Sequence, residues 1–361
     1  MLRKMFRVAL AATSTVLFIP YAIAFVAELI YGKPSKSHNR FLRALNPKRV
    51  YAFNYSLIRE LKYFKYIKLY FAWTDFYRNE TIDRLIKDIE YGQNRNSLDV
   101  YKGRSRYTST NNTEPLKPVI IYLYGGGWSS GDKNIYGLLC SNLASLFNCI
   151  VVCPNYTLYP RGFVDDMVQD VSDVLQWVQN NAIIYGGDKN RVVMIGHSAG
   201  VHLATLTIGE LCRKYLDNNP EYLEETNFPT VHGLAGVYDI KEHYEYQTLN
   251  GIENFSNMSR VMYDNLQQFH IFSPILVLSS LPEHVRLPPM HLYHGTCDNT
   301  VPVNSSLNFG AALSLRKDKT VQVRLLNGCD HVDIMMDLME RERVWFGTMM
   351  MEIKKGLDKY L

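Results

Sequence analysis

Cysteine is scarce in this sequence of 361 residues and lacks the spacings by which it builds metal or redox sites. The six cysteines include no CxxC pair, which excludes the common zinc-binding and thioredoxin-like motifs. They are also too few and too widely spaced for a small disulfide-stapled scaffold. Cys149 and Cys153 fall in an apolar run, where cysteine behaves as a small hydrophobic residue. We therefore expect neither a zinc site nor a redox pair.

The sequence also has no internal repeat, no low-complexity tract and no recognisable nucleic-acid-binding motif. The first two absences exclude repeat architectures and compositionally biased linkers. The third argues against nucleic acid as a partner. Hydrophobic residues make up 47% of the chain, which is typical of a globular protein. Its length suffices for one large domain or for two modest ones.

Acidic residues are nearly missing from the first 70 residues, which hold thirteen Lys and Arg but only Glu28 and Glu60. A basic beginning on a mildly acidic remainder favours contact with an anionic surface. Residues 8–27 contain no charged side chain, and about twenty apolar residues are what a helix needs to cross a bilayer. We interpret residues 1–32 as a membrane anchor. The alternative is a signal peptide cleaved near Ala22-Ile23-Ala24.

Residues 33–96 form a second segment, in which cations interleave with aromatic residues. Leu57, Leu61, Phe64, Ile67 and Phe71 recur at helical spacing. This pattern predicts an amphipathic helix. It either lies beside the membrane or packs on the domain that follows, with its basic face in water.

Charge and glycosylation motifs give opposite indications of the side of the membrane. More Lys and Arg follow the apolar run than precede it, so the positive-inside rule places the body in the cytosol. Seven Asn-x-Ser/Thr sequons favour a luminal body instead, and they begin at Asn54, Asn79, Asn111, Asn155, Asn254, Asn257 and Asn304. We expect an anchor in the endoplasmic reticulum with a cytosolic body, and a luminal body stays open.

From residue 97 onward, short apolar runs alternate with helical patterns, as in a parallel sheet with crossover helices. The predicted strands lie at residues 97–101, 118–124, 149–153, 191–195, 231–237, 289–293 and 321–326. The predicted helices lie at residues 135–146, 165–181, 199–215, 303–315 and 333–359. Residues 239–288 fit neither period, and we interpret them as a cap over an active site or as a surface insertion. Residues 97–361 are thus expected to form one α/β domain, with helices on both faces of a mostly parallel sheet.

The run Gly196-His197-Ser198-Ala199-Gly200 joins a predicted strand to a predicted helix with almost no loop. A serine on so sharp a turn exposes its hydroxyl, and the flanking glycines avoid side-chain clashes. The turn also puts the serine at the amino end of a helix, where N–H groups favour a developing anion. Ser198 is therefore predicted to be a nucleophile, while His197 is too close in sequence to act as its base.

A glycine-rich loop, Tyr124-Gly125-Gly126-Gly127-Trp128, follows the strand predicted at 118–124. Glycines let backbone amides approach a bound carbonyl without steric cost. A phosphate-binding loop is excluded because no Lys-Ser/Thr pair closes it. We expect an oxyanion hole formed by the amides of Gly126, Gly127 and Ala199.

The serine needs a base, and the base needs a carboxylate that orients it. Asp298 is the only carboxylate between the strand predicted at 289–293 and the next helix, and His331 follows the last predicted strand. Both positions fall at the same sheet edge as Ser198, in the order serine, acid, histidine. Asp330 is the rival acid, but its adjacency to His331 makes an orienting geometry difficult. His294 is interpreted as structural.

These motifs make residues 97–360 resemble the α/β-hydrolase superfamily. The YGGGW loop resembles the HGGGW loop of the hormone-sensitive-lipase and arylacetamide-deacetylase branch, with Tyr124 in place of the usual histidine. The chain is more similar to the prenylcysteine methylesterases, and kynurenine formamidases share several of the motifs. The motifs of this likeness are Asn155-Tyr156 with Pro160, Asp166-Met167-Val168 with Asp170, Tyr185-Gly186-Gly187-Asp188 with Arg191, the serine turn before His202, Gly236-Val237-Tyr238, and Phe272-Ser273-Pro274.

The resemblance implies a membrane-bound esterase that acts on the methyl ester of a prenylated carboxyl-terminal cysteine. Its predicted mechanism uses Ser198, His331 and Asp298, and it needs no metal or cofactor. The expected partners are a lipophilic ester, such as a prenylated protein terminus, and the membrane. Hydrolysis of an amide or formamide by the same triad stays open, as does a general carboxylesterase or lipid deacetylase. A non-catalytic binding protein is disfavoured because no triad member is missing.

Overall fold

A computed structural model describes residues 18–31, 42, 45–81, 83–103, 115–218, 228–316 and 321–357 of the chain. The chain divides into two compact units. Residues Met1–Lys65 and Tyr244–Ser259 form one, which we call the helical unit. Residues Tyr66–His243 and Arg260–Leu361 form the other, which we call the sheet unit.

The sheet unit is built on an eight-stranded sheet with the order β1-β2-β4-β3-β5-β6-β7-β8. The strands are β1 (Leu85–Tyr91), β2 (Asn96–Lys102), β3 (Lys117–Leu123), β4 (Ile150–Pro154), β5 (Gly187–His197), β6 (Thr230–Leu234), β7 (Met290–Gly295) and β8 (Val321–Leu326). Strand β2 pairs antiparallel with both β1 and β4, and the remaining pairs are parallel. The predicted mostly parallel sheet is therefore confirmed.

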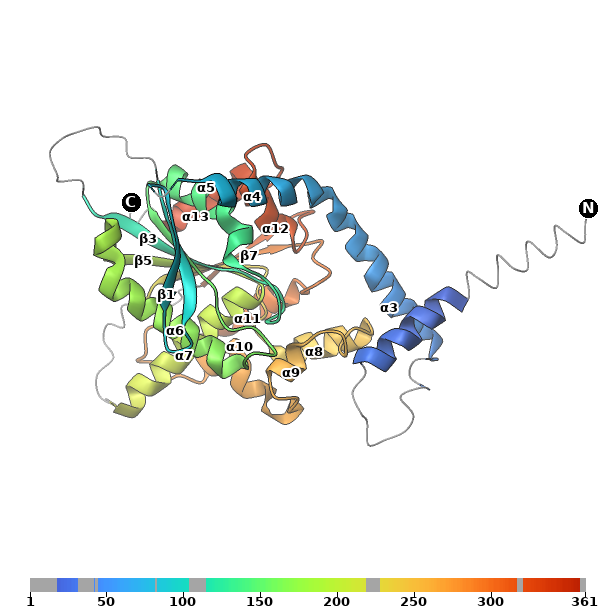
Figure 1. Cartoon of the computed structure of the whole chain (residues 1–361). Coiled ribbons are helices and arrows are strands. Elements are labelled where there is room, and N and C mark those ends of the chain that lie inside the picture. The colour runs from blue at the N-terminus through green and yellow to red at the C-terminus, as the bar shows by residue number, and fades with distance from the viewer. Residues whose placement is uncertain are drawn as a thin grey trace, which may run out of the picture. The chain divides into compact units, whose positions relative to one another are not determined.

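Helices cover both faces of this sheet. They are α4 (Ile67–Asn79), η2 (Lys133–Tyr136), α5 (Gly137–Phe147), α6 (Val164–Asn181), η3 (Ala182–Tyr185), α7 (Ala199–Asn218), η4 (Leu266–Phe272), α10 (Pro274–Ser279), α11 (Asn304–Ser314), α12 (Asp333–Met336), η5 (Asp337–Met339) and α13 (Phe346–Leu357). Figure 1 shows α6 and α7 on one face and α4 and α5 on the other. Strand β4 is buried throughout, which explains its continuous apolar sequence.

Strand β1 was not predicted, because three of its seven residues, Lys87, Asp88 and Glu90, are charged and interrupt the apolar pattern of LIKDIEY. Its pairing with β2 shifts register between Ile86 and Ile89, and Asp88 between them has a φ of 56°. A bulge of this kind turns side chains out of the regular alternation that identifies a strand in a sequence.

Three predicted boundaries are wrong. The helix expected over 333–359 breaks into α12, η5 and α13, because residues 340–345 form a turn in which the Trp345 amide donates to Asp337. The strand expected over 231–237 ends at Leu234, since Ala235 has a φ of 49°. Part of the expected cap is a crossover helix, because α10 packs against α7 and α11.

The helical unit contains a helix over residues 18–31, α3 (Pro47–Glu60), and parts of η1 (Leu61–Tyr66), α8 (Ile240–Leu249) and α9 (Met258–Val261). Its apolar cluster consists of Ala24, Val50 and Phe53, with Phe255 stacked on Phe53 at 4.4 Å. Among the described residues, none of the helices has both the length and the apolar character required to cross a membrane. The predicted anchor over 8–27 falls partly outside the described residues, which begin at residue 18.

Candidate active site

Ser198 lies on the sharp turn between β5 and α7, with a φ of 51° that few non-glycine residues adopt. The glycines on either side are required by close packing. A Cβ at Gly196 would lie 2.6 Å from the Val201 nitrogen, and one at Gly200 would lie 2.2 Å from the Leu123 carbonyl oxygen. The backbone amide of Ser198 donates to the Leu234 carbonyl at 2.9 Å, which fixes the turn against β6.

His331 connects the serine to a carboxylate, and the structure brings these three predicted residues together. Its Nε2 lies 3.1 Å from Ser198 Oγ, and its Nδ1 lies 2.7 Å from Asp298 Oδ2. Because an ionised carboxylate only accepts hydrogen bonds, Nδ1 carries the proton and Nε2 is free to accept from the serine hydroxyl. This is the tautomer that a general base requires.

The carboxylate of Asp298 accepts four hydrogen bonds. Oδ1 accepts from the amides of Thr300 and Val301 at 2.8 and 2.9 Å. Oδ2 accepts from His331 and also from His294 Nε2, which lies 3.1 Å away. Burial alone would raise the pKa of Asp298. The attraction of His331 and the hydrogen bonds from His294 and His331 outweigh burial and hold that pKa below its ordinary value.

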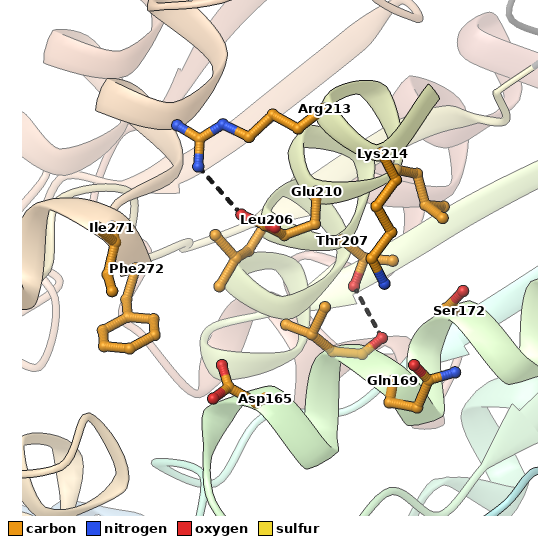
Figure 2. Close-up of a pocket in the computed structure, with 12 residues that line it drawn as sticks. Asp165, Gln169, Ser172, Leu206, Thr207, Glu210, Arg213, Lys214, Ile271 and Phe272 are labelled. Carbon is orange, nitrogen blue, oxygen red and sulfur yellow. Dashed lines mark hydrogen bonds and ion pairs between the residues drawn. The ribbon is translucent and has the colours of Figure 1, made fainter. Parts of the chain in front are cut away.

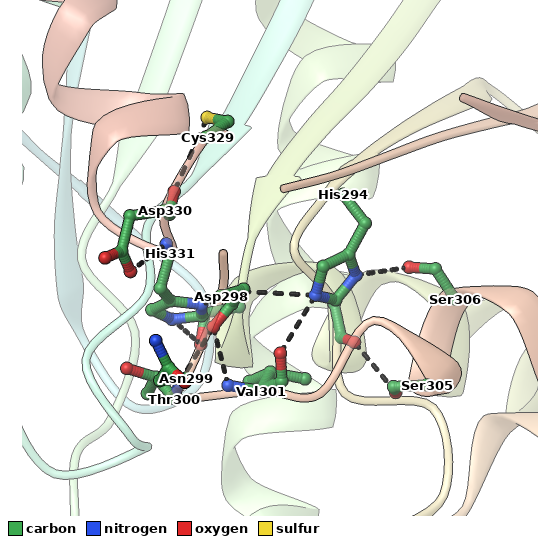
Figure 3. A network of polar contacts seen from close by, with 12 residues as sticks. His294, Asp298, Asn299, Thr300, Val301, Ser305, Ser306, Cys329, Asp330 and His331 are labelled. Carbon is green, nitrogen blue, oxygen red and sulfur yellow. Dashed lines mark hydrogen bonds and ion pairs between the residues drawn. The ribbon is translucent and has the colours of Figure 1, made fainter. Parts of the chain in front are cut away.

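Asp330 and His294 lie beside the triad and make different contacts with it (Figure 3). Asp330 Oδ1 accepts from the backbone amide of His331 at 2.6 Å, so the rival acid faces the main chain of His331. His294 is fully buried, with Nδ1 2.7 Å from Ser306 Oγ and Nε2 3.0 Å from the Val301 carbonyl. Its contact with Asp298 was missed by the sequence analysis, which treated it as structural. In the sequence, this contact was indicated only by the position of His294 at the end of β7, four residues before Asp298.

His197 lies beside the triad. Its Nε2 is 2.9 Å from the main-chain oxygen of His331, so this nitrogen donates. Burial, together with the proximity of His331, lowers the pKa of His197 to about 3. The ring thus supports the backbone of His331 and is not directed at the serine as a base.

The glycine loop runs over the nucleophile. A Cβ at Gly125 would lie 2.9 Å from Ser198 Cβ, which shows how closely the loop approaches. Gly126 and Gly127 have φ values of 137° and 59°, so glycine is needed at both for the backbone to turn. Within the described residues, the structure gives no hydrogen-bond partner to the amides of Gly126, Gly127 or Ala199.

Polar contacts fix both ends of this loop. Tyr124 Oη donates to Asn155 Oδ1 at 2.9 Å, and the same oxygen accepts from the Lys133 amide at 2.8 Å. Asn155 Nδ2 donates to Asp132 at 3.1 Å. Tyr124, which stands where similar loops have histidine, therefore anchors the loop to the end of β4. The Asn155 sequon has its side-chain amide engaged in this network.

The other end of the loop is held by Trp128. Its Nε1 donates to His202 Nδ1 at 3.1 Å, and His202 Nε2 donates to the Phe272 carbonyl at 2.8 Å. Burial lowers the pKa of His202 to about 4, which keeps the ring neutral and preserves both hydrogen bonds. The glycine loop, α7 and η4 are thus linked through one imidazole.

No group of three or more His, Cys, Asp or Glu side chains within the described ranges is arranged to hold a metal ion. A hydroxyl, an imidazole and a carboxylate in series beside free backbone amides can perform acyl transfer.

Comparison with known proteins agrees with this geometry. The BD-FAE family matches the chain over residues 105–313, which include Ser198 and Asp298. Isoprenylcysteine alpha-carbonyl methylesterase ICME of Arabidopsis thaliana is 31% identical over 254 residues, which cover 69% of this chain and 57% of that protein. Esterase LipQ of Mycobacterium tuberculosis is 31% identical over 224 residues, or 59% of this chain and 50% of that protein. The chain thus spans about half the length of the curated relatives it matches.

Solved structures show the fold. A hyperthermophilic esterase of Pyrobaculum calidifontis superimposes with a TM-score of 0.61 and 19% identity, over 83% of this chain and 93% of that one. Esterase B of Lactobacillus rhamnosis gives a TM-score of 0.62 and 19% identity, over 84% of this chain and 95% of that one. The predicted α/β-hydrolase fold is confirmed, as is the likeness to the isoprenylcysteine methylesterases.

Proposed function

Because the chain belongs to the BD-FAE family, we propose that it hydrolyses carboxylic esters through an acyl-serine intermediate. The observation that carries this proposal is the continuous contact from Asp298 through His331 to Ser198, with distances of 2.7 and 3.1 Å. This contact directs His331 Nε2 toward the serine hydroxyl and Nδ1 toward the carboxylate, which is the orientation that acyl transfer requires.

The first half of the reaction forms the acyl-enzyme. His331 Nε2 removes the proton from Ser198 Oγ as this oxygen attacks the ester carbonyl. The carbonyl oxygen becomes an oxyanion, which the amides of Gly126, Gly127 and Ala199 stabilise. The tetrahedral intermediate then collapses, the C–O bond to the alcohol breaks, and His331 delivers its proton to the departing alkoxide.

The second half regenerates the enzyme. A water molecule gives a proton to His331 and adds to the acyl carbonyl, the same amides stabilise the second oxyanion, and Ser198 leaves with the proton from His331. Asp298 stabilises the imidazolium in both halves and holds its tautomer. The products are one carboxylic acid and one alcohol.

The substrate class that we propose is a lipophilic ester, such as the methyl ester of a prenylated cysteine. Support comes from the names of the plant relatives, which are isoprenylcysteine methylesterases at 28–31% identity. The name of LipQ supports a broader esterase activity.

A substitution at the nucleophile tests this proposal. Ser198→Ala should abolish hydrolysis of p-nitrophenyl butyrate and of farnesylcysteine methyl ester, and Ser172→Ala on α6 serves as the matched control. Activity of Ser198→Ala near that of the control would reject the proposal. Turnover of N-formylkynurenine by the unmodified protein, without turnover of either ester, would instead favour the formamidase alternative.

We further propose that the protein associates with the membrane of the endoplasmic reticulum and that its body faces the cytosol. Large apolar side chains are exposed on the helix over 18–31, on α3 and on α4, among them Phe18 (69%), Ile58 (65%) and Phe71 (66%). Lys62, Lys65 and Lys68 accompany them and suit anionic headgroups. The protein should stay in the pellet after carbonate extraction, and deletion of residues 1–32 should release a larger share. A mobility shift with endoglycosidase H would contradict the cytosolic orientation.

A further inference from the structure

A row of four aromatic rings lies on the sheet unit and has no part in the mechanism above. Tyr159 lies 5.9 Å from Phe163, Phe163 stacks on Tyr263 at 4.6 Å, and Tyr263 lies 6.1 Å from Phe272, measured between ring centroids. Two rings come from the segment before α6 and two from the segment around η4, so the fold brings together residues about a hundred positions apart.

Both ends of this aromatic row are attached to the active site. The Tyr159 amide donates to the Trp128 carbonyl at 3.0 Å, directly after the glycines of the oxyanion loop. At the other end, the Phe272 carbonyl accepts from His202, whose own amide donates to the Ser198 carbonyl at 3.2 Å. The row is therefore linked by hydrogen bonds to the oxyanion loop at one end and, through His202, to the serine turn at the other.

The middle of the row is exposed and its backbone is strained. Phe163 is 36% exposed and Tyr263 is 44% exposed, whereas Phe272 at the end of the row is buried. Tyr263 and Asp264 have φ values of 61° and 54°, a conformation that is costly for both side chains. Tyr263 Oη donates to Asp165 at 2.8 Å, which directs the ring onto Phe163. An aromatic ring that stays at the surface contributes little to core packing. Backbone strain at such a residue is typical of a binding site.

A cavity of about 460 Å³ adjoins the row, since Asp165 and Phe272 belong to its lining. It lies between α6, α7 and η4, and Figure 2 shows Ile271 and Phe272 on the side opposite Ser172. Leu206, Ile271 and Phe272 form an apolar stretch of the wall, and the charged side chains of the lining are Asp165, Glu210, Arg213 and Lys214. The apolar part of the cavity thus continues the row.

We propose that this aromatic row, with the apolar part of the adjoining cavity, binds the alkyl or isoprenoid chain of the ester substrate. The inference rests on the proposed esterase function. It identifies the part of the protein that would determine specificity for the hydrocarbon chain of the substrate. Ring faces and aliphatic side chains favour a hydrocarbon. The phenol of Tyr263 is already bonded to Asp165, so this residue offers the face of its ring to a ligand.

Removal of single rings tests the proposal. Phe163→Ala and Tyr263→Ala should lower kcat/KM for p-nitrophenyl palmitate and farnesylcysteine methyl ester by roughly tenfold, which corresponds to the loss of one well-packed apolar contact. For p-nitrophenyl butyrate, whose chain does not reach the row, kcat/KM should stay within about twofold of the unmodified enzyme. Tyr263→Phe, which keeps the ring, should retain most of the chain-length preference.

Two further variants make the result unambiguous. Tyr263→Asn removes the ring while suiting the left-handed backbone at this position, so it should fold and show the same selective loss. Tyr215→Ala, at a 41% exposed aromatic residue of α7, should leave all esters unaffected. Equal losses for short and long esters, or no loss for the long ones, would overturn the proposal. If the unmodified protein hydrolysed no ester, the proposed function itself would fail.

Discussion

His331 is held by four different residues, which together leave its ring a single useful orientation. Asp298 accepts from Nδ1, Ser198 lies at Nε2, His197 donates to its main-chain oxygen, and Asp330 accepts from its main-chain nitrogen. The first two contacts set the tautomer and the direction of proton transfer. The other two fix the backbone, so that the short loop after β8 does not need to be rigid on its own.

Asp298→Asn should lower kcat for ester hydrolysis by roughly three to four orders of magnitude, because the amide favours the wrong tautomer of His331. Asp330→Asn should lower kcat less than about tenfold, since the carboxylate of Asp330 accepts from the main-chain amide of His331, whereas both ring nitrogens of His331 face other residues. Steady-state kinetics on one short ester compares the two variants directly. A large loss in Asp330→Asn with a nearly silent Asp298→Asn would transfer the orienting role to Asp330.

Sequence reasoning selected Ser198, Asp298 and His331 because each follows directly on a recognisable strand, and parallel strands end at one edge. It did not find the contact of His294 with the acid or that of His197 with the His331 backbone. Those contacts depend on how imidazole rings are rotated and on which backbone atoms face them. Neither the rotation of a ring nor the atoms that face it can be read from the spacing of residues in the sequence.

At the scale of elements, one imidazole joins three parts of the fold that are distant in sequence. His202, one turn after the nucleophile, connects Trp128 of the glycine loop to the end of η4. The loop has few side chains of its own to hold it, so its position over Ser198 depends on Trp128 and on Tyr124. We therefore infer that His202 positions the backbone amides that are predicted to form the oxyanion hole.

His202→Leu should lower kcat by about ten- to a hundredfold with little change in KM, because Trp128 loses its acceptor and the oxyanion amides lose their alignment. His202→Gln, which keeps an acceptor and a donor, should recover part of the loss. Thr205→Val, on the same helix, controls for helix stability. A change in KM alone, or thermal unfolding of His202→Gln far below that of the control, would show a general structural role instead.

Elements were predictable where the pattern was regular. β3, β4, α6 and α7 lie close to their expected positions because continuous apolar runs and helical spacing identify them. β1 was missed because of its bulge at Asp88, and the last helix was predicted as one piece although α12, η5 and α13 are separate. Turn contacts such as Trp345 with Asp337 decide such breaks and leave no periodic signal.

At the scale of the whole molecule, burial lowers the pKa of four histidines of the sheet unit far enough to keep them neutral at pH 7. Burial lowers the pKa of His197 and His232 to about 3 and that of His202 and His243 to about 4. The unfolded chain binds protons at these residues near pH 6.5, well before the folded chain does. Their burial therefore costs nothing above pH 6.5, and stability is lost as the pH falls from there toward 4.

The melting temperature should accordingly be constant between about pH 7 and 8 and should fall by more than about 10 °C at pH 5, where each such histidine costs roughly 2 kcal/mol. Differential scanning fluorimetry across this range measures the effect. His232→Gln, which is remote from the triad, should reduce the slope without changing kcat. A flat melting temperature down to pH 4.5 would contradict the assignment of these rings as neutral and buried.

The most direct test of the account is covalent labelling of the nucleophile. Incubation with a fluorophosphonate, followed by peptide mass spectrometry, should find the adduct on Ser198 and on no other serine. Ser198→Ala should show no adduct, and Asp298→Asn should label much more slowly than the unmodified enzyme. An adduct on a different serine, or none on the folded protein, would contradict the central claim that Ser198, His331 and Asp298 form the catalytic triad of an esterase.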